Sequence, residues 1–273
     1  MFLSFLHRVT TLLLPCFLLA GCAATKAQTP PILPPVPTQT DRKQTDIWQT
    51  DDCDLSLVDK EAKLVAITFD DAPTRRLNAL LEVFIQFNKS HPLRPASATL
   101  FCNGCGMNGQ TKESLYTAFA MGIELGNHSF SHLDLTTLSV EEVEKEIRQV
   151  DEILQDIDGK SAHLFRAPYG KINERVKGVC KAPVIDWFID TVDWAERSPQ
   201  GIVEKTFERL QDGAIILLHD GYESTVDGIK ALLPALDKAG YQAVSVSQLA
   251  KAHGCTLRAG HVYTRARKQY KKA

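Results

Sequence analysis

Segments with the pattern of β-strands alternate with segments that have the pattern of α-helices from Leu64 onward. Seven stretches are apolar and mostly rich in β-branched residues; they read LVAITF, SATLF, GIELGN, HLFR, PVIDWFI, GAIILLH and YQAVSV. Between the third and fourth lies the clearest helix, SVEEVEKEIRQVDEILQDI, in which apolar residues recur at helical spacing. A second helix is predicted over Val226 to Lys238. This alternation predicts parallel strands joined by crossover helices.

The number of strands favours a closed or nearly closed barrel. The predicted fold class is therefore α/β, a distorted (β/α) barrel of about seven parallel strands. An open, doubly wound sheet is the alternative. In either architecture the carboxyl ends of the strands meet at one end, and ligands bind there. The chain is 44% hydrophobic and its formal charge is −2, so it has globular composition and no basic field that would indicate a nucleic-acid partner.

The first residues indicate export rather than a folded domain. Arg8 precedes a short apolar run that ends in LAGC, Leu19 to Cys22. LAGC resembles the lipobox of bacterial lipoproteins, which implies cleavage before Cys22 and lipidation of that cysteine. Ala23, where an inner-membrane lipoprotein would have Asp, resembles a signal for sorting to the outer membrane. An ordinary signal peptide or an uncleaved anchor is the alternative.

Composition divides the chain into four regions. They are a lipoprotein signal peptide (1–21), a lipid-anchored, proline-rich tether (22–57), a folded domain (58–255) and a basic C-terminal tail (256–273). The closely spaced prolines of the tether exclude a packed helix or a central strand. The tail has six Lys and Arg residues and no acid, so we expect it to be solvated. The expected location is the bacterial cell envelope, on the outer membrane and facing the periplasm.

Five cysteines follow the predicted lipidation site: Cys53, Cys102, Cys105, Cys180 and Cys255. Disulfides can form in an exported chain, but an odd number leaves at least one thiol unpaired. The C-x-x-C at 102–105 favours a local disulfide or two buried thiols over a redox site. A zinc knuckle would need a second such pair, which the sequence lacks.

Two adjacent aspartates, Asp70 and Asp71, follow the first predicted strand in TFDDAP. The third strand is followed by GNHSFSH, in which His128 and His132 are four residues apart. Two imidazoles and one carboxylate make a three-ligand site that could hold a divalent metal with positions open. The cation would neutralise one aspartate and leave the other free to act as a base. Alternatively, one aspartate caps the following helix.

Three further polar stretches fall at predicted strand ends. FRAPYG contains Arg166 and Tyr169, DTVDW contains Asp193 and Trp194, and ILLHD contains His219. An arginine at such a place could orient a carboxylate through bidentate hydrogen bonds. Each stretch alone also fits an ordinary role as a surface ion pair, a core tryptophan or a helix cap.

Taken in order, TFDDAP, HSFSH, RAPYG, DTVDW and LLH resemble the five motifs of the polysaccharide deacetylases (carbohydrate esterase family 4, the NodB-homology domain). The resemblance runs from about Leu64 to Leu249, and Ala72 stands where the family usually has Gly. It implies a NodB-type barrel and a metal-dependent hydrolase that removes acetyl groups from N-acetylated sugars and releases acetate. The glycan would be peptidoglycan, an exopolysaccharide or a chitin-like chain.

The resemblance also implies roles for single residues. Three would bind the metal, which is expected to be zinc or another divalent ion: Asp71, His128 and His132. Asp70 would take a proton from the attacking water, and Arg166 would hold Asp70 in place. His219 would protonate the leaving amine, with Asp193 orienting its ring.

Three more residues would contact the substrate: Tyr169 through its backbone N–H, and Trp194 and Leu217 as walls of the acetyl pocket.

The expected partners are an acetylated glycan and, through Cys22, a membrane; no protein partner is indicated. The alternatives are a tethered glycan-binding protein without catalysis, and an esterase that removes O-acetyl groups from acetylxylan-like glycans. A non-haem iron oxygenase is a further alternative, because two His and one carboxylate also suit iron.

Overall fold

The computed structural model describes Trp48 and residues 53–267. The predicted signal peptide, Cys22 and the tether up to residue 52, apart from Trp48, lie outside these residues. Within the part of the chain that the structure describes, no helix is both long enough and apolar enough to cross a membrane.

A parallel sheet forms the frame of the described domain. Its strands are β1 (Lys63–Ala72), β2 (Thr99–Cys102), β3 (Glu124–Asn127), β4 (Val184–Ile185), β5 (Ile189–Asp190), β6 (Ile215–His219), β7 (Tyr241–Val244) and β8 (Val262–Tyr263). The main sheet has the order β3-β2-β1-β6-β5, and β7 pairs with the first half of β1. Every pairing between named strands is parallel.

Single bridges extend this sheet into a ring. Phe165 bridges Asn127 at the end of β3 and also Val184 in β4. Strand β4 pairs with β8. Arg265, just after β8, bridges Ala214, just before β6, in antiparallel fashion. The sheet therefore closes into a distorted barrel, and the predicted fold class is confirmed.

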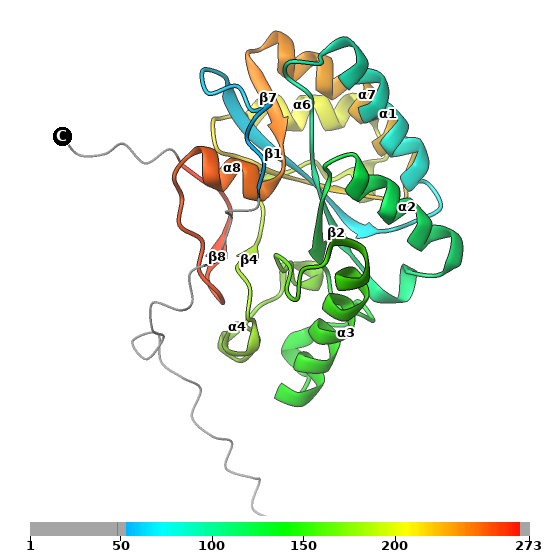
Figure 1. The fold of residues 1–273 in the computed structure, drawn as a ribbon, viewed down its shortest axis with the longest axis vertical. Helices are drawn as coiled ribbons and strands as arrows, with labels where there is room; N and C mark the ends of the chain where they lie inside the picture. Colours follow the sequence, from blue (N-terminus) through cyan, green and yellow to red (C-terminus); the bar gives the residue numbers. More distant parts are fainter. Residues whose placement is uncertain (1–47, 49–52, 268–273) are drawn as a thin grey trace, which may run out of the picture. The chain divides into compact units, whose positions relative to one another are not determined.

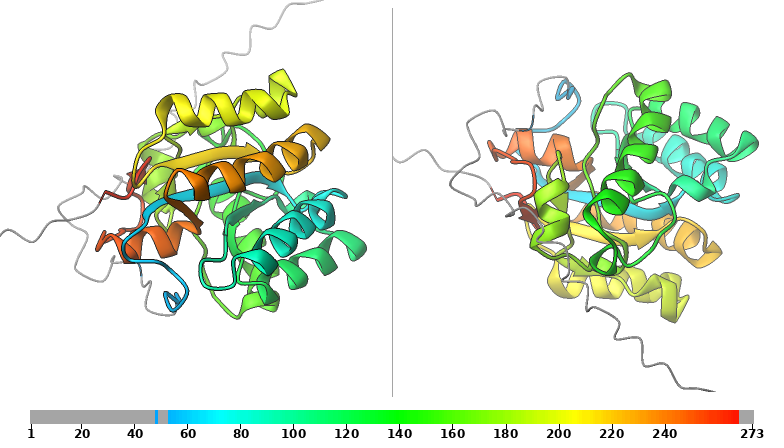
Figure 2. Two further views of the ribbon diagram at one scale, coloured as in Figure 1. Left: turned by 90° about the horizontal axis from the view of Figure 1, so that it is seen from above. Right: turned by 90° about the horizontal axis from the view of Figure 1, so that it is seen from below.

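The helices lie outside the strands (Figures 1 and 2). They are α1 (Leu77–Ser90), α2 (Gly109–Ala120), α3 (Val140–Asp158), α4 (Glu174–Val179), α5 (Asp193–Glu196), α6 (Pro199–Arg209), α7 (Glu223–Lys238) and α8 (Val246–Ala252), with 3-10 helices η3 (Gly104–Gly106), η4 (Leu135–Thr137) and η5 (Pro168–Gly170). Neighbours along the outside are α6 with α7, α7 with α1, α1 with α2, and α2 with α3. This order follows the order of the strands beneath.

The local sequence explains where α3 begins and ends. The Ser139 side chain accepts the backbone N–H of Glu142 and the Glu142 side chain accepts that of Ser139, so a capping box begins α3. Gly159 ends it in the left-handed conformation, at φ 78°. The helix buries an apolar face, but Glu146 is also buried on it.

Side chains of β1 alternate between two cores. Val65 and Ile67 pack in the cluster between the sheet and the helices, whereas Ala66 packs in the cluster inside the barrel. Because strand side chains alternate, Asp70 continues the inner face at the carboxyl end of β1. The barrel interior therefore ends in a carboxylate at the mouth where ligands are expected.

Three local expectations differ from the structure. HLFR contributes only the bridges of Phe165. The predicted strand 183–189 is split, because β4 pairs with β8 while β5 pairs with β6. The expected solvated tail is packed over residues 256–267, where Leu257 and Ala266 are buried and β8 joins the sheet. Residues 268–273 lie outside the described part.

Candidate metal and catalytic site

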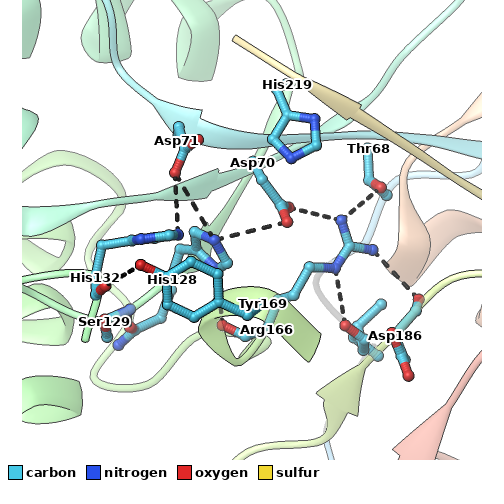
Figure 3. Close-up of polar contacts among 12 residues, drawn as sticks. Thr68, Asp70, Asp71, His128, Ser129, His132, Arg166, Tyr169, Asp186 and His219 are labelled. Carbon is cyan, nitrogen blue, oxygen red and sulfur yellow. Dashed lines mark hydrogen bonds and ion pairs between the residues drawn. The ribbon is translucent and has the colours of Figure 1, made fainter. Parts of the chain in front are cut away.

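Four strand ends converge at the mouth of the barrel. Asp70 at the end of β1 is in register with His219 at the end of β6. His128 directly follows β3, and its backbone N–H donates to Cys102 O at the end of β2. Arg166 follows the Phe165 bridge, and its side chain reaches Asp70 (Figure 3). Residues from distant parts of the chain thus face one small volume.

Asp71, His128 and His132 form the candidate metal site. Asp71 Oδ1 lies 3.9 Å from His128 Nε2 and 3.4 Å from His132 Nε2 (Figure 3). One potential ligand atom from each residue lies within 4.8 Å of the other two, close enough for one ion to bind all three. Two imidazoles and a carboxylate are a donor set that suits zinc and leaves coordination positions open.

The tautomer of His128 is set by its surroundings. Its Nδ1 lies 2.8 Å from the backbone carbonyl of Arg166, which can only accept a hydrogen bond. The neutral ring therefore carries its proton on Nδ1, and the lone pair of Nε2 faces the two aspartates. That is the form in which an imidazole binds a metal.

Asp70 lies beside this site but has a different environment. It is 4% exposed, and its Oδ1 accepts a hydrogen bond of 2.7 Å from Arg166 Nη1. Burial alone would raise its pKa, but the charge of the Arg166 guanidinium and its hydrogen bond, together with the charge of His219, hold the pKa of Asp70 below its usual value. An ionised carboxylate fixed next to a metal site can accept a proton from water.

Arg166 is 1% exposed, and its guanidinium is held on several sides. Besides Asp70, it donates to Thr68 Oγ1 at 2.7 Å and to the carbonyls of Ile185 and Asp186 at 2.9 and 3.3 Å. Thr68 was not among the residues predicted from the sequence. Its position two residues before Asp70, on the same face of β1, was the signal that could have identified it.

His219 is paired with a buried carboxylate. Its Nδ1 lies 2.8 Å from Asp193 Oδ1, and its backbone N–H donates to Asp193 Oδ2 at 2.9 Å. Burial would lower the pKa of His219, but the hydrogen bond to Asp193 and the charge of Asp70 raise it above its usual value. Thr225 Oγ1 also donates to Asp193, at 2.6 Å. Thr225 was missed, because it comes from α7 and no local motif marks it.

Of the expected substrate residues, Tyr169 lies against His132, and Trp194 and Leu217 belong to the elements that carry Asp193 and His219. Tyr169, in η5, is 61% exposed and has a left-handed backbone, at φ 60°. Its hydroxyl donates to the carbonyl of His132 at 3.3 Å. Trp194, in α5, is 51% exposed, whereas Leu217 is buried. Leu217 precedes His219 by two residues on β6, so both side chains lie on the same face of the sheet.

The pairs Asp70–Arg166 and His219–Asp193 help to decide between two reactions, hydrolysis and oxygenation by a non-haem iron. A site of two His and one carboxylate is compatible with iron oxygenases as well as with hydrolases. Hydrolysis needs a base for the water and an acid for the leaving group, and both are present next to the site. The arrangement therefore favours hydrolysis.

The C-x-x-C forms neither of the two expected structures. Cys102 is buried and Cys105 is exposed, and none of the five cysteines within the described residues is in a disulfide. Burial raises the pKa of the Cys102 thiol, which makes it a poor nucleophile.

Comparisons with known proteins agree with this geometry. The family model described as "Polysaccharide deacetylase" matches residues 58–183. The chain is 37% identical over 193 residues to the peptidoglycan-N-acetylmuramic acid deacetylase PdaC of Bacillus subtilis, a match that covers 70% of this chain and 40% of that protein. It is 31% identical to a peptidoglycan-N-acetylglucosamine deacetylase of Bacillus cereus, with 70% of this chain and 90% of the relative covered.

A solved structure described as "T48 deacetylase with substrate" superposes with a TM-score of 0.69 at 32% identity. The superposition covers 76% of this chain and 99% of that one. The chain spans about two fifths of the length of the first curated relatives, PdaC and the Listeria monocytogenes deacetylase PgdA.

Proposed function

The chain belongs to the polysaccharide deacetylase family, and we propose that it is a metal-dependent hydrolase that removes acetyl groups from N-acetylated sugars of a glycan and releases acetate. The observation that carries the proposal is the difference in surroundings between two adjacent aspartates, Asp70 and Asp71. Asp71 lies near both His128 and His132, whereas Asp70 lies near His128 alone, at 3.6 Å, and is buried with its other oxygen bound to Arg166 at 2.7 Å. Two neighbouring carboxylates thus have the environments of a ligand and of a base.

The candidate ligands fit a zinc ion, with Asp71, His128 and His132 as the protein donors. A zinc ion bound there would supply a Lewis acid for the acetyl carbonyl and would lower the pKa of a water molecule. Zinc is the metal that we propose, on the strength of this donor set.

Asp70 accepts the proton of the attacking water, and Arg166 keeps it ionised and in place. His219 donates a proton to the departing amine, and Asp193 holds its ring and favours its protonated form. The backbone N–H of Tyr169 is the proposed donor to the oxyanion that forms at the acetyl carbon. A glycan-binding protein without catalysis would need neither the buried base nor the acid.

Peptidoglycan is the proposed substrate. Several relatives carry names that specify peptidoglycan N-acetylmuramic acid or N-acetylglucosamine deacetylases. The exposed ring of Tyr169, which lies against His132, and that of Trp194, next in the chain to Asp193, are suited to contact sugar rings of a chain that extends past the site.

We further propose that Cys22 carries lipid and anchors the protein in the bacterial envelope, on the outer membrane facing the periplasm. The support is the LAGC sequence behind an apolar run and the proline-rich segment after it. A tethered enzyme in the periplasm would meet peptidoglycan directly.

The direct test is acetate release by the purified protein with added zinc. The substrates are peptidoglycan, N-acetylglucosamine oligomers and acetylated xylan. Release from peptidoglycan is the expected result. Release from the xylan alone would establish the O-acetyl esterase instead, and release from none of them would refute the proposal.

A further inference from the structure

Two buried carboxylates outside the proposed machinery, Glu146 and Asp220, each hold the backbone of a segment that carries a candidate metal ligand. Glu146 is 9% exposed and Asp220 is 4% exposed. Neither residue touches the three candidate ligands through a hydrogen bond or ion pair that the structure shows. Both act on the backbone next to a ligand.

Glu146 holds the segment that carries His132. It lies on the buried face of α3, and its Oε2 accepts the backbone N–H of Ser131 at 2.7 Å. Ser131 immediately precedes His132, whose φ of 54° is left-handed. Ser129, two residues before Ser131, is also left-handed, at φ 64°. Non-glycine residues adopt this conformation only where the surroundings impose it.

Asn127 ties the other end of the same segment to α3. Its Oδ1 accepts the N–H of Ser129 at 2.9 Å, and its Nδ2 donates to Ile147 O at 2.8 Å. Helix α3 therefore holds both ends of the segment 127–131 by hydrogen bonds, and Glu146 provides the contact nearest to His132.

Asp220 holds the segment that carries Asp71 in the same manner. Its backbone N–H donates to Asp70 O at 2.8 Å, and its Oδ2 accepts the N–H of Thr74 at 2.7 Å. Asp71 lies between these two contacts and has a left-handed φ of 63°. The other oxygen of Asp220, Oδ1, is buried and has no hydrogen-bond partner among the described residues.

Packing alone does not account for charged residues at these positions. Within the described residues, no Lys, Arg or His side chain forms an ion pair within 4 Å of either carboxylate. Burying an unpaired carboxylate is costly, and an apolar side chain would fill either position more cheaply. At each position, the carboxylate supplies an oxygen that accepts a backbone N–H.

We propose that Glu146 and Asp220 are positioning residues for the metal: they hold His132 and Asp71 in place before the ion arrives. The inference rests on the proposed function, because it takes Asp71, His128 and His132 as the ligands. Groups that orient metal ligands typically contribute about 10- to 100-fold in metal affinity.

The test measures zinc affinity by competition with a chelator, alongside thermal unfolding of the metal-free proteins. Glu146→Ala and Asp220→Ala should bind zinc about 10- to 100-fold more weakly than the wild type. Glu146→Gln and Asp220→Asn keep an acceptor oxygen and should recover most of the affinity. The exposed residues Glu144 and Asp227 supply controls of equal charge change, Glu144→Ala and Asp227→Ala, which should bind as the wild type does.

Glu146→Asp is the second variant if an alanine variant fails to fold. It keeps the charge but withdraws the acceptor from Ser131, so its zinc affinity should also fall. Wild-type affinity in Glu146→Asp or in folded alanine variants would overturn the inference while leaving the proposed function standing. An equal loss in the alanine and the amide variants would overturn it as well. A wild-type protein that binds no divalent metal would refute both.

Discussion

Replacing Arg166 with methionine should destabilise the protein by an amount that the structure allows us to work out. Arg166 and Asp70 are 1% and 4% exposed and lie 2.7 Å apart. Removing one partner of a buried ion pair costs about 3–5 kcal/mol, because the other charge stays buried without compensation. Methionine retains an apolar stem against the ring of Phe101, so lost packing contributes little. At about 2–4 °C per kcal/mol, the melting temperature should fall by roughly 6–20 °C.

A double-mutant cycle with Asp70→Asn tests whether the ion pair causes this cost. In the Asp70→Asn background, Arg166→Met should cost at least about 2 kcal/mol less than in the wild type, since no charge is left unpaired. The assay is the free energy of unfolding in denaturant at pH 7, in metal-free buffer. The pKa of Asp70 is lowered in the folded protein, so the pair stabilises above the unfolded pKa and its contribution disappears as the pH falls through the folded pKa. An equal cost of Arg166→Met in both backgrounds would refute the reasoning.

Three further predictions concern the anchor, the metal and the acid. Cys22→Ser should release the protein from membranes or block its processing; fractionation and maturation like the wild type would rule out lipidation. His132→Ala should lose both zinc and acetate release, because two protein ligands hold zinc poorly; stoichiometric zinc in this variant would remove His132 from the site. Asp193→Asn should shift the basic limb of the pH profile of kcat/KM to lower pH, because Asp193 raises the pKa of His219; an unmoved limb would contradict that pairing.

The sequence was sufficient to predict the barrel and the residues at its mouth. Strand ends in a parallel barrel share one edge, so Asp70, His128, Arg166 and His219 could be grouped before any coordinates were known. The helix at 139–157 was also predictable, because its capping box and apolar spacing are local signals. Each strand and helix could be recognised from residues close together in the chain, whereas the grouping of the four site residues depended on the parallel architecture and on the family resemblance.

What could not be predicted depends on pairing between distant segments. The split at 183–189 arises because β4 pairs with β8 while β5 pairs with β6, and no property of those residues alone reveals the two partners. The packing of residues 256–267 was not predicted, because the basic composition of the C-terminal segment indicated a solvated tail. Thr225 and Glu146 lie on helices, where a threonine or glutamate is ordinarily a surface residue, and they contact Asp193 and the backbone of Ser131 respectively.

The most direct test of the central claim compares Asp70→Asn with Asp71→Asn, each measured for zinc content and for acetate release with and without excess zinc. Asp70→Asn should retain zinc while its turnover falls by roughly 10²–10⁴, the usual contribution of a general base, and added zinc should not restore it. Asp71→Asn should lose zinc, and excess zinc should restore part of its activity. Loss of zinc from Asp70→Asn together with its retention by Asp71→Asn would contradict the assignment of base and ligand.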